Sequence, residues 1–229
     1  MPLYFNAAHL PGPTNEYVAW IDVMGTQAAM SRSLSGTANF IFKLHTAALQ
    51  SPRATLSLYP VMDGLYAASP NQQEMLEFLR SIFQSVAEEF NQATGPLHRF
   101  IIRAALAFGP CVHGRNVPQQ SSQVLSANAA YRDSVLLGLP MVQAHVGESS
   151  APPFGVFVHE SARTFAPAGQ SPLHHIWWRW SSQANMQSWT TLAKKLPKHL
   201  NWCKTHALPI GYATERILVH KEMVKQYFA

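Results

Sequence analysis

Apolar residues recur along the chain with two spacings, one typical of strands and one typical of helices. Residues Tyr17–Val23 are apolar on both faces except for a single aspartate, which predicts a strand in the middle of a covered sheet. Gly25-Thr26 ends this run. Residues 27–50 then have the pattern of a helix that is interrupted near Ser35-Gly36.

The next two apolar runs, residues 54–61 and 65–69, flank Met62-Asp63-Gly64. Asp-Gly is a strong turn signal, so these runs predict a β-hairpin. Residues 71–93 give the clearest amphipathic helix of the chain. Its apolar positions are Met75, Phe78, Leu79, Ile82, Phe83, Val86 and Phe90.

The second half of the chain predicts a strand at 100–108 that Gly109-Pro110 breaks, a polar loop at 116–122 and a helix at 123–138. Short strands are expected at 154–159 and 176–180. The last fifty residues are mostly helical in pattern, with interruptions at Pro197 and Pro209.

The order of the first six elements, β-α-β-β-α-β, predicts a ferredoxin-like α+β fold, in which helices pack on an antiparallel-rich sheet. We expect three parts: an irregular lead-in at 1–16, a catalytic domain at 17–180, and a helical C-terminal extension at 181–229 packed on the same domain. Many unrelated activities share this plan, so the fold alone does not indicate a function.

Composition narrows the class of protein. The 229 residues suffice for one domain with a real core, and the formal net charge of +5 fits an anionic partner such as a nucleotide. The basic residues are scattered, apart from Lys194-Lys195 and Lys198, which argues against a nucleic-acid binder. The sequence shows no signal peptide and no long apolar segment, so we expect no membrane association and a cytoplasmic location.

Two aspartates carry the candidate chemistry. Asp22 closes the first strand and Asp63 lies in the hairpin turn, and in this topology the strand and the hairpin are neighbours. Two carboxylates at one sheet edge, with backbone carbonyls such as that of Val23 and triphosphate oxygens, can hold Mn²⁺ or Mg²⁺, with two ions per site.

The residues after the first strand, Met24, Gly25 and Thr26, stand at a strand-to-helix junction, where free backbone N–H groups attract phosphate. No Walker motif is present, so an ordinary turn is the alternative. Asn128 and Arg132 stand four residues apart, on one side of the predicted helix. An amide and a guanidinium in that arrangement can grip a sugar and a phosphoryl group.

The segment Arg103–Gly114 adds a spaced motif. The sequence resembles the class III nucleotidyl cyclases, whose strand pattern is Arg-x-Gly-x-x-x-Gly-x-Val-x-x-Gly, followed by a helix with Asn-x-x-x-Arg. Arg103, Gly109 and Gly114 keep this skeleton, whereas Ala105 replaces the first glycine and Val112 is shifted by one. The resemblance covers roughly residues 17–160.

The resemblance implies roles. Asp22 and Asp63 match the metal-binding aspartates, Asn128 and Arg132 match the transition-state pair, and Arg103 is a candidate for binding the triphosphate. In that family the aspartates and the Asn/Arg pair come from different protomers, so a homodimer with active sites shared across the interface is implied.

Two positions depart from the purine-specific members. In the resembling family, two positions read the base. Tyr59 stands where adenylate cyclases have Lys and guanylate cyclases have Glu, and Ser121 stands where adenylate cyclases have Asp or Thr. A bulky aromatic would shrink the base pocket and favour a pyrimidine. In this respect the chain looks like the cyclases of Pycsar antiphage defence, which implies a uridylate cyclase, a phosphorus–oxygen lyase that makes cyclic UMP for a separate effector.

Four alternatives remain at this stage. A cytidylate cyclase would form cyclic CMP, and an adenylate cyclase with an unusual pocket would form cyclic AMP. A polymerase-like palm enzyme would share the fold and the paired acids. A degenerate cyclase domain would bind nucleotide without catalysis.

Overall fold

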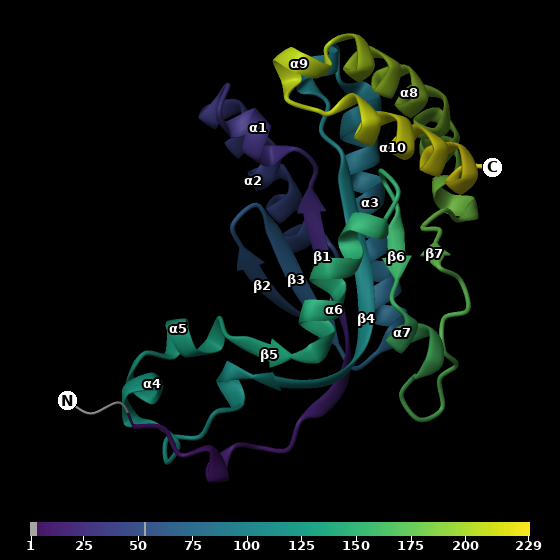
Figure 1. Cartoon of the computed structure of the whole chain (residues 1–229). Coiled ribbons are helices and arrows are strands. Elements are labelled where there is room, and N and C mark those ends of the chain that lie inside the picture. Colours follow the sequence, from purple (N-terminus) through teal and green to yellow (C-terminus); the bar gives the residue numbers. More distant parts are fainter. Residues whose placement is uncertain (1–3, 53) are drawn as a thin grey trace.

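The computed structural model describes residues 4–52 and 54–229, and in this part of the chain seven strands form one sheet (Figure 1). Its order is β2-β3-β1-β4-β6-β7, and β5 pairs with the far end of β4. All pairings are antiparallel except that of β4 with β6. The strands are β1 Thr14–Val23, β2 Ser57–Val61, β3 Gly64–Ser69, β4 Ile102–His113, β5 Leu136–Gly138, β6 Val156–Val158 and β7 Trp177–Trp178.

Helices pack on this sheet, so the predicted α+β architecture of an antiparallel-rich sheet with helices on it is confirmed. The α-helices are α1 Thr26–Met30, α2 Leu34–Gln50, α3 Gln72–Gln92, α4 Gln123–Ala127, α5 Ala129–Asp133, α6 Leu139–Gly147, α7 Glu160–Thr164, α8 Met186–Thr205, α9 Ala207–Ile210 and α10 Thr214–Tyr227. None of the helices in the described residues is long and apolar enough to span a membrane.

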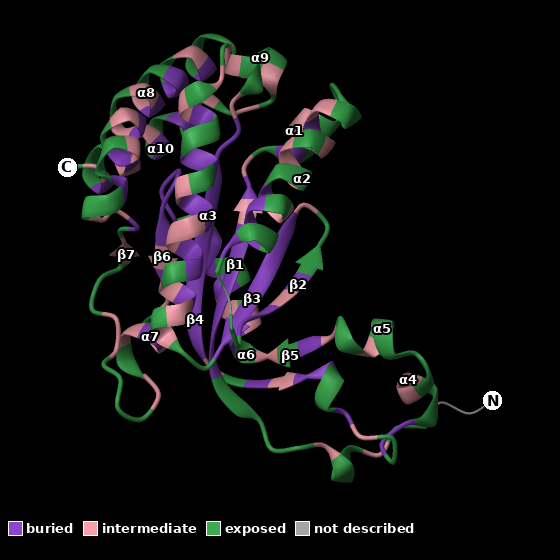
Figure 2. Cartoon of the chain, turned by 180° about the vertical axis from the view of Figure 1, so that it is seen from behind, coloured by how far each residue is buried: buried purple, intermediate pink, exposed green. Residues whose placement is uncertain are grey.

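The two faces of the sheet differ, because side chains alternate along each strand. Tyr17, Ala19 and Ile21 of β1 join the large core under α2 and α3. Val18 and Trp20 face the other way, into a smaller cluster against α6. Figure 2 shows the sheet and the inner side of α3 as buried, whereas the α4–α5 segment is largely exposed.

The predicted break at Gly109-Pro110 is wrong, because β4 continues through both residues to His113. The outer edge of β4 has no strand partner between the segments that pair with β6 and β5. At Phe108 the backbone N–H on this edge donates to the Ser161 hydroxyl. Two residues further, the nitrogen of Pro110 lies on that same edge, so its missing N–H removes no ladder bond.

The predicted helix at 123–138 is also wrong. It divides at Asn128 into α4 and α5, and the chain then turns into β5. The N–H of Gly114 donates to the carbonyl of Val135, and a Cβ at Gly114 would lie 1.8 Å from the carbonyl oxygen of Arg132. Glycine at 114 therefore lets the end of α5 lie directly on β4, and this contact redirects the chain.

At the C-terminus, α8 runs unbroken through Pro197, so the interruption expected there is wrong. Its buried residues, among them Leu192, Leu196 and Leu200, pack against α3 and α10, and this burial outweighs the lost helical hydrogen bond. At Pro209 the helical segment does end, as predicted. α9 stops one residue later, and Gly211 caps it in the left-handed conformation.

Candidate active site

Asp22 and Asp63 lie at one end of the sheet. β1 pairs with β3, and this register sets Ile21 opposite Leu65 beside the hairpin turn. The Thr26 hydroxyl donates a hydrogen bond to the Asp63 carboxylate. A Cβ at Gly64 would lie 2.5 Å from the carbonyl oxygen of Ile21, so only glycine lets the hairpin tip approach β1 this closely.

The charge balance around Asp22 is unfavourable to its ionised form. Burial is the largest cause that raises the pKa of Asp22, to about 7, and the carboxylates of Glu148 and Asp63 raise it further. Arg103, opposite Asp22 in the β1–β4 register, acts in the other direction. Carboxylates with too little positive charge around them are the environment in which a bound cation is stabilised.

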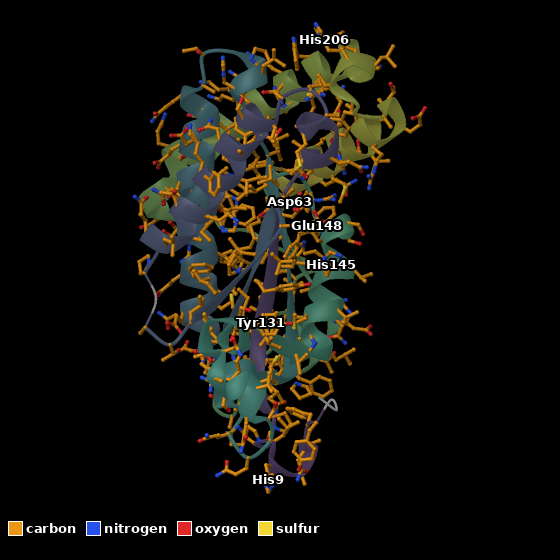
Figure 3. The ribbon with its side chains drawn as sticks, turned by 90° about the vertical axis from the view of Figure 1, so that its left-hand side faces the viewer. His9, Asp63, Tyr131, His145, Glu148 and His206 are labelled. Atoms are coloured by element: carbon orange, nitrogen blue, oxygen red, sulfur yellow. The ribbon has the colours of Figure 1, made fainter. Side chains whose placement is uncertain are left out.

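Arg103 forms a buried ion pair with Glu148, a residue that the sequence analysis did not single out. Glu148 begins the short 3₁₀ helix η4, Glu148–Ser150, directly after α6. Burial raises the pKa of Glu148, whereas Arg103 lowers it. Figure 3 shows Glu148 and Asp63 in the same part of the molecule. The one sequence signal that could have indicated Glu148 is its position between an apolar helix and a turn of small residues.

The donor set suits a hard divalent cation. Among the described residues no group of three or more His, Cys, Asp or Glu side chains lies close enough to hold a metal ion. Two carboxylates, Asp22 and Asp63, and a backbone oxygen such as that of Val23 would have to be completed by oxygens of a substrate or water, as is usual for Mg²⁺ sites.

The three residues predicted to bind phosphate at the β1–α1 turn differ in whether their polar groups are already engaged. Gly25 takes the left-handed conformation, with φ of 77°, and precedes α1. The N–H of Met24 already donates to the carbonyl of Ile101 at 2.8 Å. Thr26 is buried and its hydroxyl is engaged by Asp63. The backbone of Gly25 is thus the most accessible part of this turn.

Tyr59 belongs to a second group of residues. Its side chain is buried and its hydroxyl hydrogen-bonds Nδ1 of His113, while Nε2 of His113 lies 2.8 Å from Oε1 of Glu16. His113 and Glu16 are also buried. This Tyr–His–Glu hydrogen-bond network could not be predicted from the sequence, because its members come from three strands and share no local motif.

The remaining predicted site residues follow the Tyr–His–Glu network in the sequence. Ser121 precedes α4, whereas Asn128 and Arg132 belong to the α4–α5 segment. Ser121 is buried and its hydroxyl has no hydrogen-bond partner among the described residues. The Asn128 amide donates to the carbonyl of Val124 at 2.8 Å, and Arg132 pairs with its neighbour Asp133 at 2.8 Å. Asn128 stands at the junction of the two short helices, so the pair is four residues apart without sharing one helix.

Within one chain, the Asn128/Arg132 pair lies apart from the Asp22/Asp63 pair. Arg103 and His113 lie near the two ends of β4, ten residues apart. The α4–α5 segment lies beyond His113, and Figure 3 shows Tyr131 of α5 well away from Asp63. The structure therefore brings Asp22, Asp63, Thr26 and Arg103 together and keeps Asn128 and Arg132 apart from them.

The sequence matches no protein-family model and no curated protein. Among solved structures, a monomeric double mutant of the guanylyl cyclase domain of the RhoGC fusion protein from the aquatic fungus Blastocladiella emersonii is similar. The TM-score is 0.48 at 13% identity, over 67% of this chain and 83% of that chain.

The catalytic core of a rhodopsin-guanylyl cyclase with converted specificity, in complex with ATPαS, gives a TM-score of 0.48 at 16% identity, over 66% of this chain and 80% of that one. The guanylate cyclase domain of RhGC from Catenaria anguillulae, in complex with GTP, gives 0.46 at 13%, over 66% and 81%. Likeness at this level transfers no activity, so the function proposed below rests on the side chains of this chain.

Proposed function

We propose that the chain is a homodimeric, metal-dependent nucleotidyl cyclase that converts UTP to 3′,5′-cyclic UMP and pyrophosphate. The observation that supports this most is the division of the predicted site into two halves at opposite ends of β4. One half, with Asp22 and Asp63, offers carboxylates for cations, and the other, with Asn128 and Arg132, offers an amide and a guanidinium. Neither half suffices for phosphoryl transfer, whereas the two are complementary.

A two-fold dimer would join these halves. In an isologous dimer the same patch of each subunit faces its copy, so each acidic half can meet the partner's Asn/Arg half and form two equal sites. The surface between the halves is apolar and exposed. Its residues, each more than half exposed, are Tyr131, Leu137, Leu139, Val142 and Val146 of α5, β5 and α6. Exposed apolar side chains on three successive elements favour an interface between copies.

In the proposed reaction, the ribose 3′-oxygen attacks the α-phosphorus and the bond from that phosphorus to the α,β-bridging oxygen breaks. Pyrophosphate leaves with the bridging oxygen, and the hydroxyl proton passes to solvent. Two cations, Mn²⁺ or Mg²⁺, bound by Asp22, Asp63 and the Val23 carbonyl would neutralise the triphosphate and acidify the attacking hydroxyl.

The protein's own groups would position the substrate and stabilise developing charge. Arg132 would hold the α-phosphoryl oxygens as negative charge develops there, and Asn128 would orient the ribose. Arg103 and the backbone of Gly25 would face the triphosphate. For Arg132 to do so, it must exchange its neighbour Asp133 for the substrate, which costs little because Asp133 is exposed.

The base assignment rests on Tyr59 and Ser121. The hydroxyl of Tyr59 is held by His113, so the ring has a fixed place, and a fixed aromatic side chain leaves less room for a purine. The Ser121 hydroxyl has no hydrogen-bond partner among the described residues but is fully buried, so the segment around it would have to open for this hydroxyl to bond a base edge. CTP, and ATP as the purine case, are the competing substrates.

The biological role follows from the resemblance of the sequence to the Pycsar cyclases. We propose a cytoplasmic enzyme whose cyclic UMP is read by a separate effector in bacterial antiphage defence. A palm-type polymerase and a non-catalytic nucleotide-binding homologue are the competing functions. Both acids and the Asn/Arg pair are present, which favours a catalytic domain over the latter.

The test is to incubate the purified protein with Mn²⁺ and ATP, GTP, CTP or UTP separately, and to identify the products by mass. Cyclic UMP as the main product would support the whole proposal. Cyclic CMP or cyclic AMP would keep the reaction and reject the base assignment. Extension of a primed template would favour the polymerase, and no product from a folded dimer would favour the non-catalytic homologue.

A further inference from the structure

A cavity of about 340 Å³ lies beside the acidic half of the site, between the β1–α1 turn and the C-terminal helices. We call it the C-terminal cavity. Val23, Met24, Gly25 and Thr26 form one wall, and α8, the α9–α10 connection and α10 form the opposite one. In Figure 1 these helices lie at the same end of the molecule as α1. The C-terminal extension, to which the proposed function assigns no part, therefore borders the predicted phosphate-binding turn.

The connection between α9 and α10 is held against α1 by close contacts. The Arg32 guanidinium donates to the carbonyl of Pro209 at 3.2 Å. Gly211 has φ of 65°, and a Cβ there would lie 2.6 Å from the Cβ of Ala28. A side chain at 211 would push the connection away from α1, so glycine at this position keeps the beginning of α10 at the cavity.

Two buried side chains at the cavity each have a polar atom without a hydrogen-bond partner among the described residues. Arg103 is only 9% exposed, and its Nη1 has no hydrogen-bond partner although its Nε is paired with Glu148. His199 is 5% exposed; its Nε2 lies 3.5 Å from Sγ of Cys203, and its Nδ1, a donor or an acceptor according to the tautomer, is also without a partner. Both residues line the cavity. A buried polar atom without a partner is costly, and a ligand with acceptor oxygens would satisfy the Arg103 donor.

The cavity is strongly cationic. Four arginines line it and, among the described residues, no carboxylate does; the four are Arg32, Arg99, Arg103 and Arg216. Because Arg103 is already paired with Glu148, the excess positive charge comes from the other three. Arg216 is exposed in the first turn of α10 and forms no ion pair within the described chain. Two carboxylates lie within reach of its charge: exposed Glu215 in the same turn, and buried Glu148, whose pKa Arg216 lowers.

The N-terminus of α10 adds further donors. This helix has 14 residues, and its N-cap, Ala213, provides no side-chain hydrogen bond. Ala213 itself lines the cavity. The first N–H groups of a helix have no partner within the helix and carry a partial positive charge, so they favour an anion.

We infer that α10 completes the binding site for the terminal phosphates of the nucleotide, with Arg216 and the N–H groups of its first turn facing Arg103 and the Gly25 turn. This rests on the proposed function for the identity of the nucleotide, but the anion site itself does not. The C-terminal extension is then part of the site, and Arg216 is a substrate-binding residue that also holds the pyrophosphate product.

Isothermal titration calorimetry with inorganic pyrophosphate, with and without Mg²⁺, tests this on the full chain. We expect the wild type to bind pyrophosphate and Arg216→Ala to bind it about tenfold more weakly, the scale of one charge-assisted contact. Lys225→Ala removes the same charge from an exposed position of the same helix and should change the affinity less than about twofold. Equal melting temperatures would show that each variant folds.

Two outcomes would overturn the inference: no binding of pyrophosphate by the wild type, or equal weakening in Arg216→Ala and Lys225→Ala. The proposed function fails separately. Arg216-dependent binding of pyrophosphate without any cyclic product would keep the anion site and reject the cyclase. Cyclase activity with an unchanged KM and unchanged pyrophosphate affinity in Arg216→Ala would do the reverse.

Discussion

The two halves of the proposed site are built in different ways. At the acidic half, Asp22, Arg103 and Glu148 are close together, Arg103 and Glu148 are buried and paired, and the surroundings raise the pKa of Asp22 to about 7. At the other half, Asn128 is exposed and Arg132 bonds only to its own neighbour. The first half is thus fixed within one chain, whereas in the proposed dimer the second would become a site only when the partner subunit meets it.

This contrast separates two kinds of residue. Substitutions of Arg103 and Glu148 at the acidic half should affect both activity and folding, because this charged pair is buried in the monomer. Substitutions at the Asn/Arg half should affect activity alone. The variants below test that distinction, starting with the largest expected effect.

Asp63→Ala should lower the rate of cyclic nucleotide formation by about 10³-fold or more, because it removes a cation ligand worth several kcal/mol to the transition state. Turnover is measured with the nucleotide that the wild type consumes, and the dimer is checked by light scattering. Glu77→Ala removes an exposed carboxylate of α3 and serves as the control. Full activity of Asp63→Ala would contradict the metal assignment.

Arg132→Ala should lower kcat by about 10²-fold or more, the scale of losing one donor that stabilises transition-state charge. Steady-state kinetics over a range of nucleotide concentrations measures it. A change confined to KM would show that Arg132 only binds substrate. Arg163→Ala, on α7 away from both halves, is a matched removal of a guanidinium and should leave kcat unchanged.

Mixing inactive Asp22→Ala chains with inactive Arg132→Ala chains should restore activity, because a heterodimer has one intact site. With free exchange and equal amounts, half of the dimers are mixed and each has one of two sites, so about a quarter of wild-type activity is expected. Activity is measured after subunit exchange has been shown with differently tagged chains. Activity that stays at the level of the single variants would reject a shared site.

The elements that the sequence predicted well are those whose signals are local. The apolar run of β1, the Asp-Gly turn and the 3.6-residue period of α3 each specify an element within a short segment, and two of these elements carry Asp22 and Asp63. The strand pairing that joins them, β1 with β3, is confirmed.

Residues that depend on distant partners could not be predicted in this way. Glu148 is paired with Arg103, 45 residues earlier, and Glu16 interacts with His113, 97 residues later. The predicted helix at 123–138 failed for the same reason, since the contact of Gly114 with α5 decides where the chain turns. Sequence periodicity contains no information on such contacts, which form only when the sheet is assembled.

Stability should separate two arginines of the proposed site. Arg103→Ala leaves Glu148 buried without its partner and should cost about 3–5 kcal/mol in free energy of unfolding. Arg132→Ala breaks a pair with exposed Asp133 and should cost less than about 1 kcal/mol. Urea denaturation followed by circular dichroism measures both. Equal costs would contradict the distinction between a prebuilt half and an open one.

The smallest effect concerns the pH dependence of the metal-free protein. Because folding raises the pKa of Asp22 from 3.8 to about 7, the folded state holds this proton more tightly than the unfolded state does. Its contribution to stability is therefore fully present below about pH 4 and is lost as the pH rises through 7. Asp22→Asn keeps the shape without the charge, so it should raise the melting temperature more at pH 8 than at pH 5.

Other groups titrate as well, and Glu74 and Glu16, whose pKa values folding lowers, act in the opposite direction. The difference between wild type and Asp22→Asn removes their contribution, since both proteins contain them. A gain on the order of 1 kcal/mol, or ~2–4 °C, is expected at pH 8. Mn²⁺ should reverse the order of the two proteins at that pH, because only the wild type offers the cation a second carboxylate beside Asp63. A gain that is equal at both pH values would mean that Asp22 is ionised at no cost, and the acidic half would then not be preformed for a cation.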